Sequence, residues 1–178
     1  MRATCKRIFT HAAQLGAEVI LIDLLSDLPD LPPALTQLAK LQLKRGDIDS
    51  GFLLLRKSLL LYPNQSEALI YLAEIQLAAR LGDEALENLN RAIDIGTWDA
   101  TAYKMRAIIL MMKQRNSEAM ADLIQAIELE PDDPEPYSLR ASIYLLNGKF
   151  PEARSDLRHF LRHRPDDRGA VIMIGISF

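Results

Sequence analysis

Apolar residues recur three and four positions apart through most of the chain, in stretches of about 13 residues with short breaks between them. This spacing gathers apolar side chains on one face of a helix. In residues 100–133, Ala107 and Leu110 belong to one such stripe and Leu123 and Ile127 to a second. The pattern predicts an all-α chain of paired helices. Breaks are expected near 46–48, 62–66, 81–83, 96–100, 114–117, 131–133 and 148–150.

The pattern superposes on itself when the sequence is shifted by 34 residues. Such a fixed period is the sequence signature of a repeat protein. The shift aligns small residues in the first helix of each unit, large apolar residues in the second, and prolines after it. These sets are Ala39, Ala73, Ala107 and Ala141; Leu55, Leu89, Leu123 and Leu157; and Pro63, Pro131 and Pro165, with Thr97 as the exception.

The period divides the chain into units that each form a helical hairpin. One hairpin cannot bury its apolar face alone, so the units are expected to stack. Residues 1–31 are either a degenerate leading repeat or unrelated N-terminal helices, and 168–178 are an apolar tail or a truncated capping helix. The four full units are 32–65, 66–99, 100–133 and 134–167.

Capping residues agree with these units. Asp99 and Asp133 stand where a helix N-cap accepts backbone N–H groups, and Gly46 and Gly148 stand where first helices end. Gly82 comes two residues late in its unit. We therefore expect a slightly longer first helix in the second unit.

These features resemble the tetratricopeptide repeat (TPR) family over residues 32–167: the period, the small residue in the first helix, the Ala opening the second and the closing Pro. Gly51 in place of Ala and Thr97 in place of Pro depart from the pattern. The resemblance implies a right-handed α-solenoid of stacked antiparallel hairpins. It also implies a protein that binds other proteins and is not an enzyme.

In this family the first helices line a concave groove, and the resemblance places twelve residues there. Their mixture of apolar and charged side chains favours a partner's peptide or helix that presents hydrophobic residues with opposite charges beside them. Leu77 and Leu145 fit the core equally well. The twelve are Thr36, Lys40, Leu43, Ile70, Glu74, Leu77, Lys104, Ile108, Met111, Ser138, Ser142 and Leu145.

The partner itself is not evident from the sequence. Some family members clamp the terminal carboxylate of chaperone tails with Lys, Asn and Arg side chains. The matching positions here, among them Tyr71 and Met105, do not preserve that clamp in either register. We expect a protein-interaction scaffold, and the alternative is a regulatory or targeting module of a larger enzyme or complex.

Charge excludes one class of partner and leaves another open. The formal net charge is −3, so the chain lacks the positive field that draws proteins to nucleic acid. Residues 66–133 carry 13 acidic and 6 basic side chains, whereas 134–178 carry 5 and 7. The basic helix around Arg158 is either a solvated end of the array or a docking patch for an acidic partner.

Two charged pairs appear together in the later units. Arg106 and Arg140 replace leucines of the earlier units, and the same two units carry Asp122 and Asp156. A partly buried charge left alone would be costly. We therefore expect an ion pair within each hairpin, in preference to a catalytic carboxylate.

Other chemistry has little support. His159 and His163 are four residues apart on a helix and Asp156 precedes them, but a convincing third metal ligand is lacking. We expect no metal and no cofactor. No catalytic motif occurs either.

The remaining sequence features concern location and self-association. The single cysteine, Cys5, favours a reducing compartment and so a cytoplasmic protein. No apolar stretch approaches the roughly 20 residues of a membrane span. The apolar tail either packs on the last hairpin or joins two chains through Val171, Ile172, Ile174 and Ile176.

Overall fold

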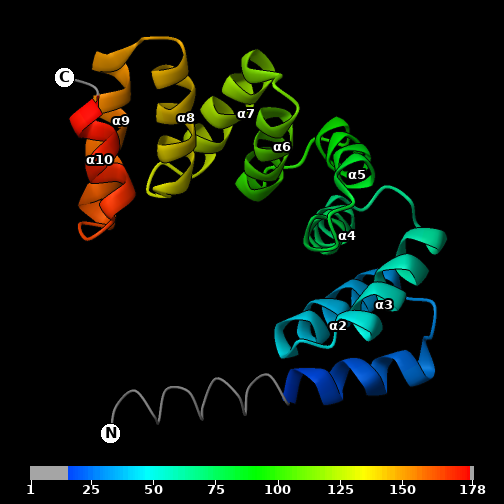
Figure 1. Ribbon diagram of the computed structural model, residues 1–178. Coiled ribbons are helices and arrows are strands. Elements are labelled where there is room, and N and C mark those ends of the chain that lie inside the picture. Colours follow the sequence, from blue (N-terminus) through cyan, green and yellow to red (C-terminus); the bar gives the residue numbers. More distant parts are fainter. Residues whose placement is uncertain (1–15, 177–178) are drawn as a thin grey trace, which may run out of the picture. The chain divides into compact units, whose positions relative to one another are not determined.

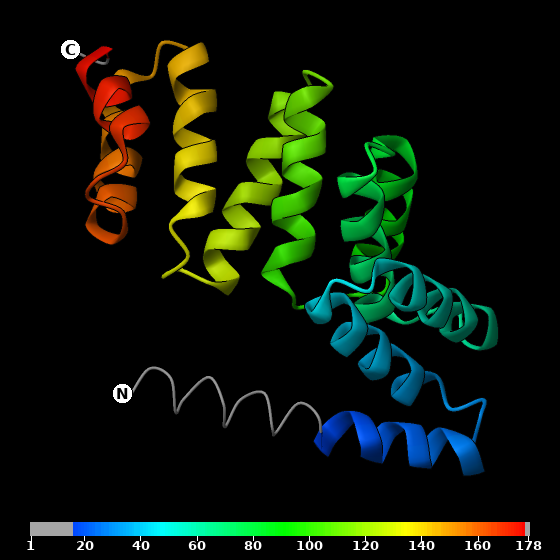
Figure 2. The same ribbon diagram turned by 60° about the horizontal axis from the view of Figure 1, so that its bottom comes forward.

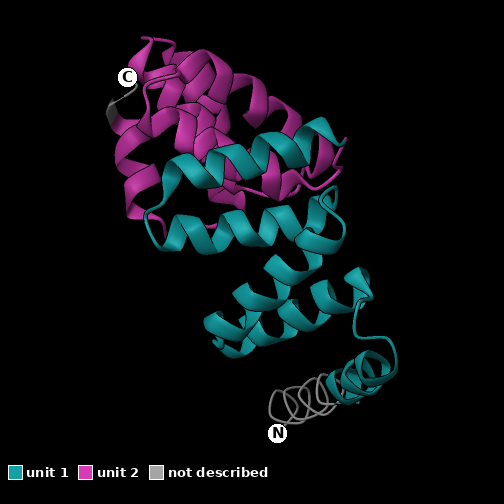
Figure 3. Ribbon diagram, turned by 90° about the vertical axis from the view of Figure 1, so that its right-hand side faces the viewer, with its two compact units in different colours: residues 1–95 teal, residues 96–178 magenta. Residues whose placement is uncertain are grey.

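The computed structural model describes residues 16–176, and every regular element among them is a helix. The chain divides into two compact units, Met1–Ile95 and Gly96–Phe178 (Figure 3). The predicted all-α fold is confirmed for these residues.

The first unit contains two helical hairpins after a helical segment at residues 16–27 (Figure 1). Helix α2 pairs with α3 to form the first hairpin, α4 pairs with α5 to form the second, and α3 packs on α4. Ala39, Leu55 and Ala68 form the centre of the core between them. The helices are α2 (Pro32–Arg45), α3 (Ile48–Leu61), α4 (Ser66–Ala78) and α5 (Gly82–Asp94).

The second unit contains the third hairpin, α6 with α7, the fourth hairpin, α8 with α9, and a final helix, α10 (Figure 2). Ala107, Ala119, Ala141 and Ala153 are completely buried, because small side chains let paired helices approach closely. The predicted helices and breaks are confirmed within about two residues. The helices are α6 (Ala100–Met112), α7 (Asn116–Leu129), α8 (Glu135–Leu146), α9 (Phe150–His163) and α10 (Arg168–Ile176).

All four hairpins turn through the same backbone conformation. Gly46, Arg80, Gln114 and Gly148, each 34 residues after the last, have φ angles of 85, 62, 61 and 70°. The prediction of a longer first helix from Gly82 was wrong, since α4 has 13 residues against 14 in α2. Arg80 itself adopts the left-handed conformation that glycine favours, so the turn keeps its register and Gly82 begins α5.

The predicted cap at Asp99 is confirmed, and Asp133, one residue before the N-cap Pro134 of α8, makes the same kind of bond. Asp99 accepts a hydrogen bond from the backbone N–H of Thr101 at 2.8 Å, and Asp133 accepts one from the N–H of Glu135 at 3.0 Å. Each satisfies a backbone donor that the first turn of a helix leaves without a partner.

The segment 16–27 is tied to the first hairpin through Glu18. This buried carboxylate accepts a hydrogen bond from Gln42 at 3.1 Å and forms an ion pair with Arg45. The first half of the proposed leading repeat, with Cys5, lies outside the described residues. The leading repeat therefore stays a prediction.

The C-terminal tail forms α10 and packs on the fourth hairpin. Ala170 is completely buried in a cluster with Leu157 and Phe160, and Ile174 packs against that cluster. Packing of the tail on the last hairpin is thus confirmed. Val171 and Ile172 remain 52% and 62% exposed, and self-association through them stays a prediction.

Candidate functional site

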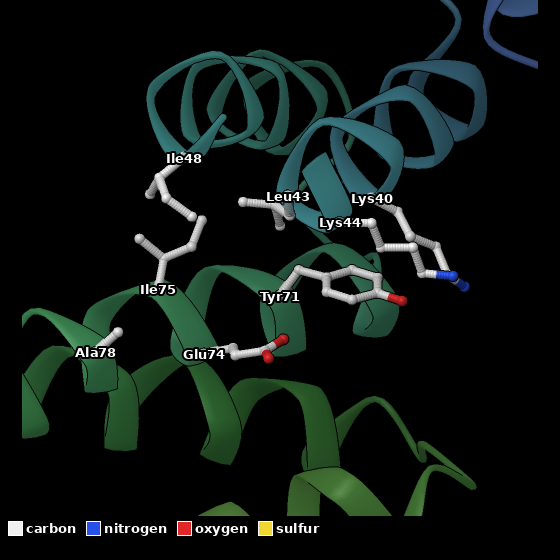
Figure 4. Close-up of a pocket in the computed structure, with 8 residues that line it drawn as sticks. All are labelled: Lys40, Leu43, Lys44, Ile48, Tyr71, Glu74, Ile75 and Ala78. Atoms are coloured by element: carbon white, nitrogen blue, oxygen red, sulfur yellow. The ribbon is translucent and has the colours of Figure 1, made fainter. Parts of the chain in front are cut away.

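A pocket of about 390 Å³ opens in the first unit where α2 and the start of α3 meet α4 (Figure 4). Apolar side chains form most of its wall, and charged side chains from α2 and α4 stand at its edge. It is lined by Lys40, Leu43, Lys44, Ile48, Tyr71, Glu74, Ile75 and Ala78.

The apolar part of the pocket depends on a glycine behind it. Ile48 and Ile75 point toward one another, and Leu43 lies beside them (Figure 4). A Cβ at Gly51 would lie only 2.6 Å from Leu43 Cδ2. Gly51, where the other three units carry alanine, therefore leaves room for Leu43 to lie against α3.

The charged edge combines Lys40, Lys44 and Glu74. The Nζ of Lys40 lies 5.5 Å from the centroid of the Tyr71 ring and 3.2 Å from Glu67 Oε1. The side-chain interaction with Tyr71 raises the pKa of Lys40, burial opposes it, and Glu67 raises it further. Lys40 is thus a fixed positive charge beside an apolar pocket.

Three of the predicted groove residues, Lys40, Leu43 and Glu74, come together in this pocket. Its other five residues were not predicted from the sequence. A helical period would have indicated some of them, because Lys44 lies one turn after Lys40, and Ala78 one turn after Glu74.

The predicted groove position nearest the start of the first helix faces inward in the first two hairpins. Thr36 and Ile70 are buried, with 2% and 4% exposure, so they do not line a surface. Within each unit, this position of the earlier hairpin reaches the start of the next hairpin. Thr36 Oγ1 lies 3.4 Å from Gln65 Oε1, and Lys104 Nζ lies 2.7 Å from Asp133 Oδ2.

Lys104 therefore serves a structural contact. It also lies 2.9 Å from Glu135 Oε2. Burial lowers the pKa of Lys104, but the hydrogen bonds to Asp133 and Glu135 outweigh it and the net pKa is raised. For Asp133, burial raises the pKa, but the hydrogen bonds from Lys104 and the Glu135 backbone outweigh it and the net pKa is lowered.

The remaining predicted residues differ in accessibility. Ile108 is 37% exposed on α6, and Met111 and Leu77 are half-buried. Leu145 packs against the core of the fourth hairpin. The hydroxyls of Ser138 and Ser142 donate to backbone carbonyls of their own helix region, those of Glu135 and Ser138.

The predicted ion pairs within the third and fourth hairpins are confirmed. Arg106 reaches Asp122 through two hydrogen bonds of 2.8 and 2.7 Å. Arg140 reaches Asp156 through two of 2.8 Å each. Both aspartates are buried, with 4% and 6% exposure. These carboxylates join the helices of a hairpin.

The histidines of α9 are packed against an aromatic ring. His159 stacks on Tyr137 with 3.8 Å between ring centroids. Burial, followed by the positive charge of Arg162, lowers the pKa of His159. Over residues 16–176, no three His, Cys, Asp or Glu side chains form a group that could hold a metal ion, and no helix is long and apolar enough to cross a membrane.

Two family models match the chain. One described as "Tetratricopeptide repeat" matches residues 36–100, and one described as "TPR repeat" matches residues 107–148. Together they cover more than half of the sequence. None of the curated proteins compared with the chain matches it.

Solved structures give the same fold. YrrB, described as a TPR protein with an unusual peptide-binding site, has a TM-score of 0.79 at 16% identity, over 88% of this chain and 81% of its own. The protein pilF of Pseudomonas aeruginosa has a TM-score of 0.79 at 14% identity, over 93% and 75%. A thermophilic TPR protein of Thermus thermophilus has 0.63 at 23% identity, over 96% and 93%. The chain therefore belongs to the tetratricopeptide repeat family, whose α-solenoid fold is a protein–protein interaction module.

Proposed function

We propose that this chain is a scaffold that holds a peptide or helical segment of a partner protein on its first helices, with the α2–α4 pocket as the anchor. The observation that supports it is the joining, in one place, of an apolar pocket and the charged side chains Lys40, Lys44 and Glu74. YrrB is described as having an unusual peptide-binding site, which makes peptide binding a reasonable expectation for a chain of this fold.

The pocket suggests the chemistry of the bound segment. A leucine-sized side chain would contact Leu43, Ile48 and Ile75. Charged side chains beside it would meet the opposite charges of Lys44 and Glu74 at the pocket edge. Burial of one such side chain contributes about 1.5–3 kcal/mol. Association itself costs several kcal/mol, so one anchor gives modest affinity.

The second unit carries its own apolar residues at the equivalent repeat positions. Ile108 and Met111 lie on α6 at the positions that Glu74 and Leu77 occupy on α4. A single cysteine in the whole sequence is in keeping with work in the cytoplasm.

The test begins with a photo-crosslinking amino acid placed at Glu74 or, as the control, at Gln125 on α7. Mass spectrometry of the crosslinked partner gives its bound segment, which is then synthesised and titrated against the protein. We expect crosslinks from position 74 and none from position 125. Crosslinks from position 125 alone would contradict the proposal.

The Ala78→Met variant then tests the pocket. Met112 occupies the same repeat position in the third hairpin and is 78% exposed, so the fold accepts methionine there. The longer side chain reduces the space in the pocket. We expect the crosslinked segment to bind this variant roughly tenfold more weakly, while Gln125→Ala binds it normally.

A further inference from the structure

The outer helix of the first hairpin carries two strongly exposed leucines. Leu53 is 65% and Leu60 84% exposed on α3. At these positions the other hairpins carry polar or small residues, all of them exposed. They are Glu87 and Asp94, Ala121 and Glu128, and Ser155 and Arg162. The repeat does not require leucine there, so its presence is specific to the first hairpin.

Both leucines line a groove of about 500 Å³ between α3, α4 and α5. None of its residues belongs to the α2–α4 pocket. Occupation of one site therefore does not require residues of the other. The groove is lined by Leu53, Arg56, Lys57, Leu59, Leu60, Leu72, Asn88 and Arg91.

Three cations and no carboxylate line this groove. Lys57 donates to the carbonyl of Pro29 at 2.7 Å, and Arg91 donates to the carbonyl of Pro63 at 3.2 Å. Lys57 also pairs with Asp30 at 3.2 Å. Arg56 lies over the Phe52 ring, 5.8 Å from its centroid. Among the ion pairs of residues 16–176, none involves Arg56 or Arg91, so neither guanidinium group has a carboxylate partner there.

We propose that this groove, formed by α3, α4 and α5, binds an acidic amphipathic segment of a partner protein. Apolar side chains of that segment contact Leu53 and Leu60, and its carboxylates meet Arg56 and Arg91. The cations decide the choice of occupant, because a basic or neutral segment would leave them desolvated and without partners.

The test uses the full chain and three synthetic peptides. The first carries leucines at helical spacing with glutamates between them, the second has lysine for each glutamate, and the third has alanine for each leucine. Fluorescence anisotropy should show binding of the first peptide alone, weakened by added salt. Equal binding of the lysine peptide, or no binding of the glutamate peptide, would overturn the proposal.

The repeat supplies the variants. Leu53→Glu with Leu60→Asp gives α3 the residues that α5 already carries, and Arg56→Asn gives it the equivalent of Asn90. Each should weaken binding of the acidic peptide, the leucine pair roughly tenfold or more. Arg56→Asn retains the leucines, so it tests the charge even if the double variant folds poorly.

Two controls test whether the peptide binds in this groove and whether the natural occupant is a partner protein. Leu146 is 73% exposed on α8 in the second unit. The Leu146→Glu variant should therefore bind the acidic peptide with unchanged affinity. An equal loss there would show unspecific apolar binding and overturn the proposal. Light scattering tests whether a second copy of the chain occupies the groove. A wild-type dimer that is absent in the leucine double variant would also overturn the proposal.

Discussion

At the scale of single residues, His159 shows how one repeat position changes with its surroundings. The equivalent residues in the other hairpins are Lys57, Arg91 and Gln125. His159 stacks on Tyr137, and burial with the nearby positive charge of Arg162 lowers its pKa. The folded state therefore favours the neutral ring.

This lowered pKa predicts a loss of stability on mild acidification. As the pH falls through about 6.5, the ordinary value for histidine, the unfolded chain takes up the proton first. The free energy of unfolding is thus highest above that pH, and it declines until the pH reaches the pKa of His159 in the folded state. The slope for this residue should stay well below the ~1.4 kcal/mol per pH unit of one full proton.

Urea unfolding between about pH 7 and 5 measures this slope. The variant His159→Gln carries the glutamine that the third hairpin has at this position. Its free energy of unfolding should depend less steeply on pH than that of the wild type. A variant with an unchanged slope would show that other groups cause the acid sensitivity.

Residue-scale predictions from the sequence failed where the backbone, and not the side chain, determined the outcome. Gly82 suggested a delayed turn, yet Arg80 adopts a φ of 62° and keeps the turn in register. Thr36 was placed in the groove, but its side chain faces Gln65 at the start of the next hairpin. Neither fact is visible in residue type alone.

At the scale of helices, the third and fourth hairpins are joined by paired charges where the first two are not. Leu38 and Leu54 stand at these positions in the first hairpin, and Leu72 and Asn88 in the second. A buried ion pair is often no more stabilising than an apolar contact of similar size. Removal of one partner is different, because it leaves the other charge uncompensated.

The repeat predicts which substitutions will show this difference. Asp122→Asn alone should lower the free energy of unfolding by about 2–3 kcal/mol, since Arg106 would lose its buried partner. The double variant Arg106→Leu with Asp122→Asn carries the leucine and asparagine of the second hairpin. Its free energy of unfolding should lie within about 1 kcal/mol of the wild-type value.

Chemical denaturation of both variants and of Arg106→Leu alone completes the cycle. Additive losses in the double variant would show that the two side chains do not stabilise the hairpin as a pair.

Helix boundaries and these ion pairs were predictable because both follow from comparison of four copies within one sequence. A period fixes the breaks, and charges that appear in the same copies indicate contact. The α2–α4 pocket was only partly predictable. Its wall includes Ile48 from the start of α3, which no pattern along the first helices indicates.

At the scale of the whole molecule, the fourth hairpin is covered by α10. Its Ala170 and Ile174 cover Leu157 and Phe160 of the fourth hairpin. A repeat hairpin buries its apolar face only when another element packs on it.

Deletion of residues 168–178 should therefore destabilise the second unit. Exposure of the leucine and phenylalanine cluster should cost about 2 kcal/mol or more, measured by thermal unfolding. The control is Ile172→Ser, because Ser138 stands at the same repeat position in the fourth hairpin and Ile172 is 62% exposed. This variant should unfold like the wild type. If the deletion changed only the molecular mass in light scattering, Val171 and Ile172 would join two chains instead.

The two Arg–Asp pairs also bear on errors of assembly during folding. Neighbouring repeats are similar enough for a helix to pair with the wrong partner, a characteristic failure of repeat proteins. Pairing of α6 with α3 or α5 would set Arg106 against Leu54 or Asn88, and the charge would lose its carboxylate. Such exchange between early and late hairpins is therefore penalised, while exchange between the third and fourth hairpins, which carry the same pair, is not.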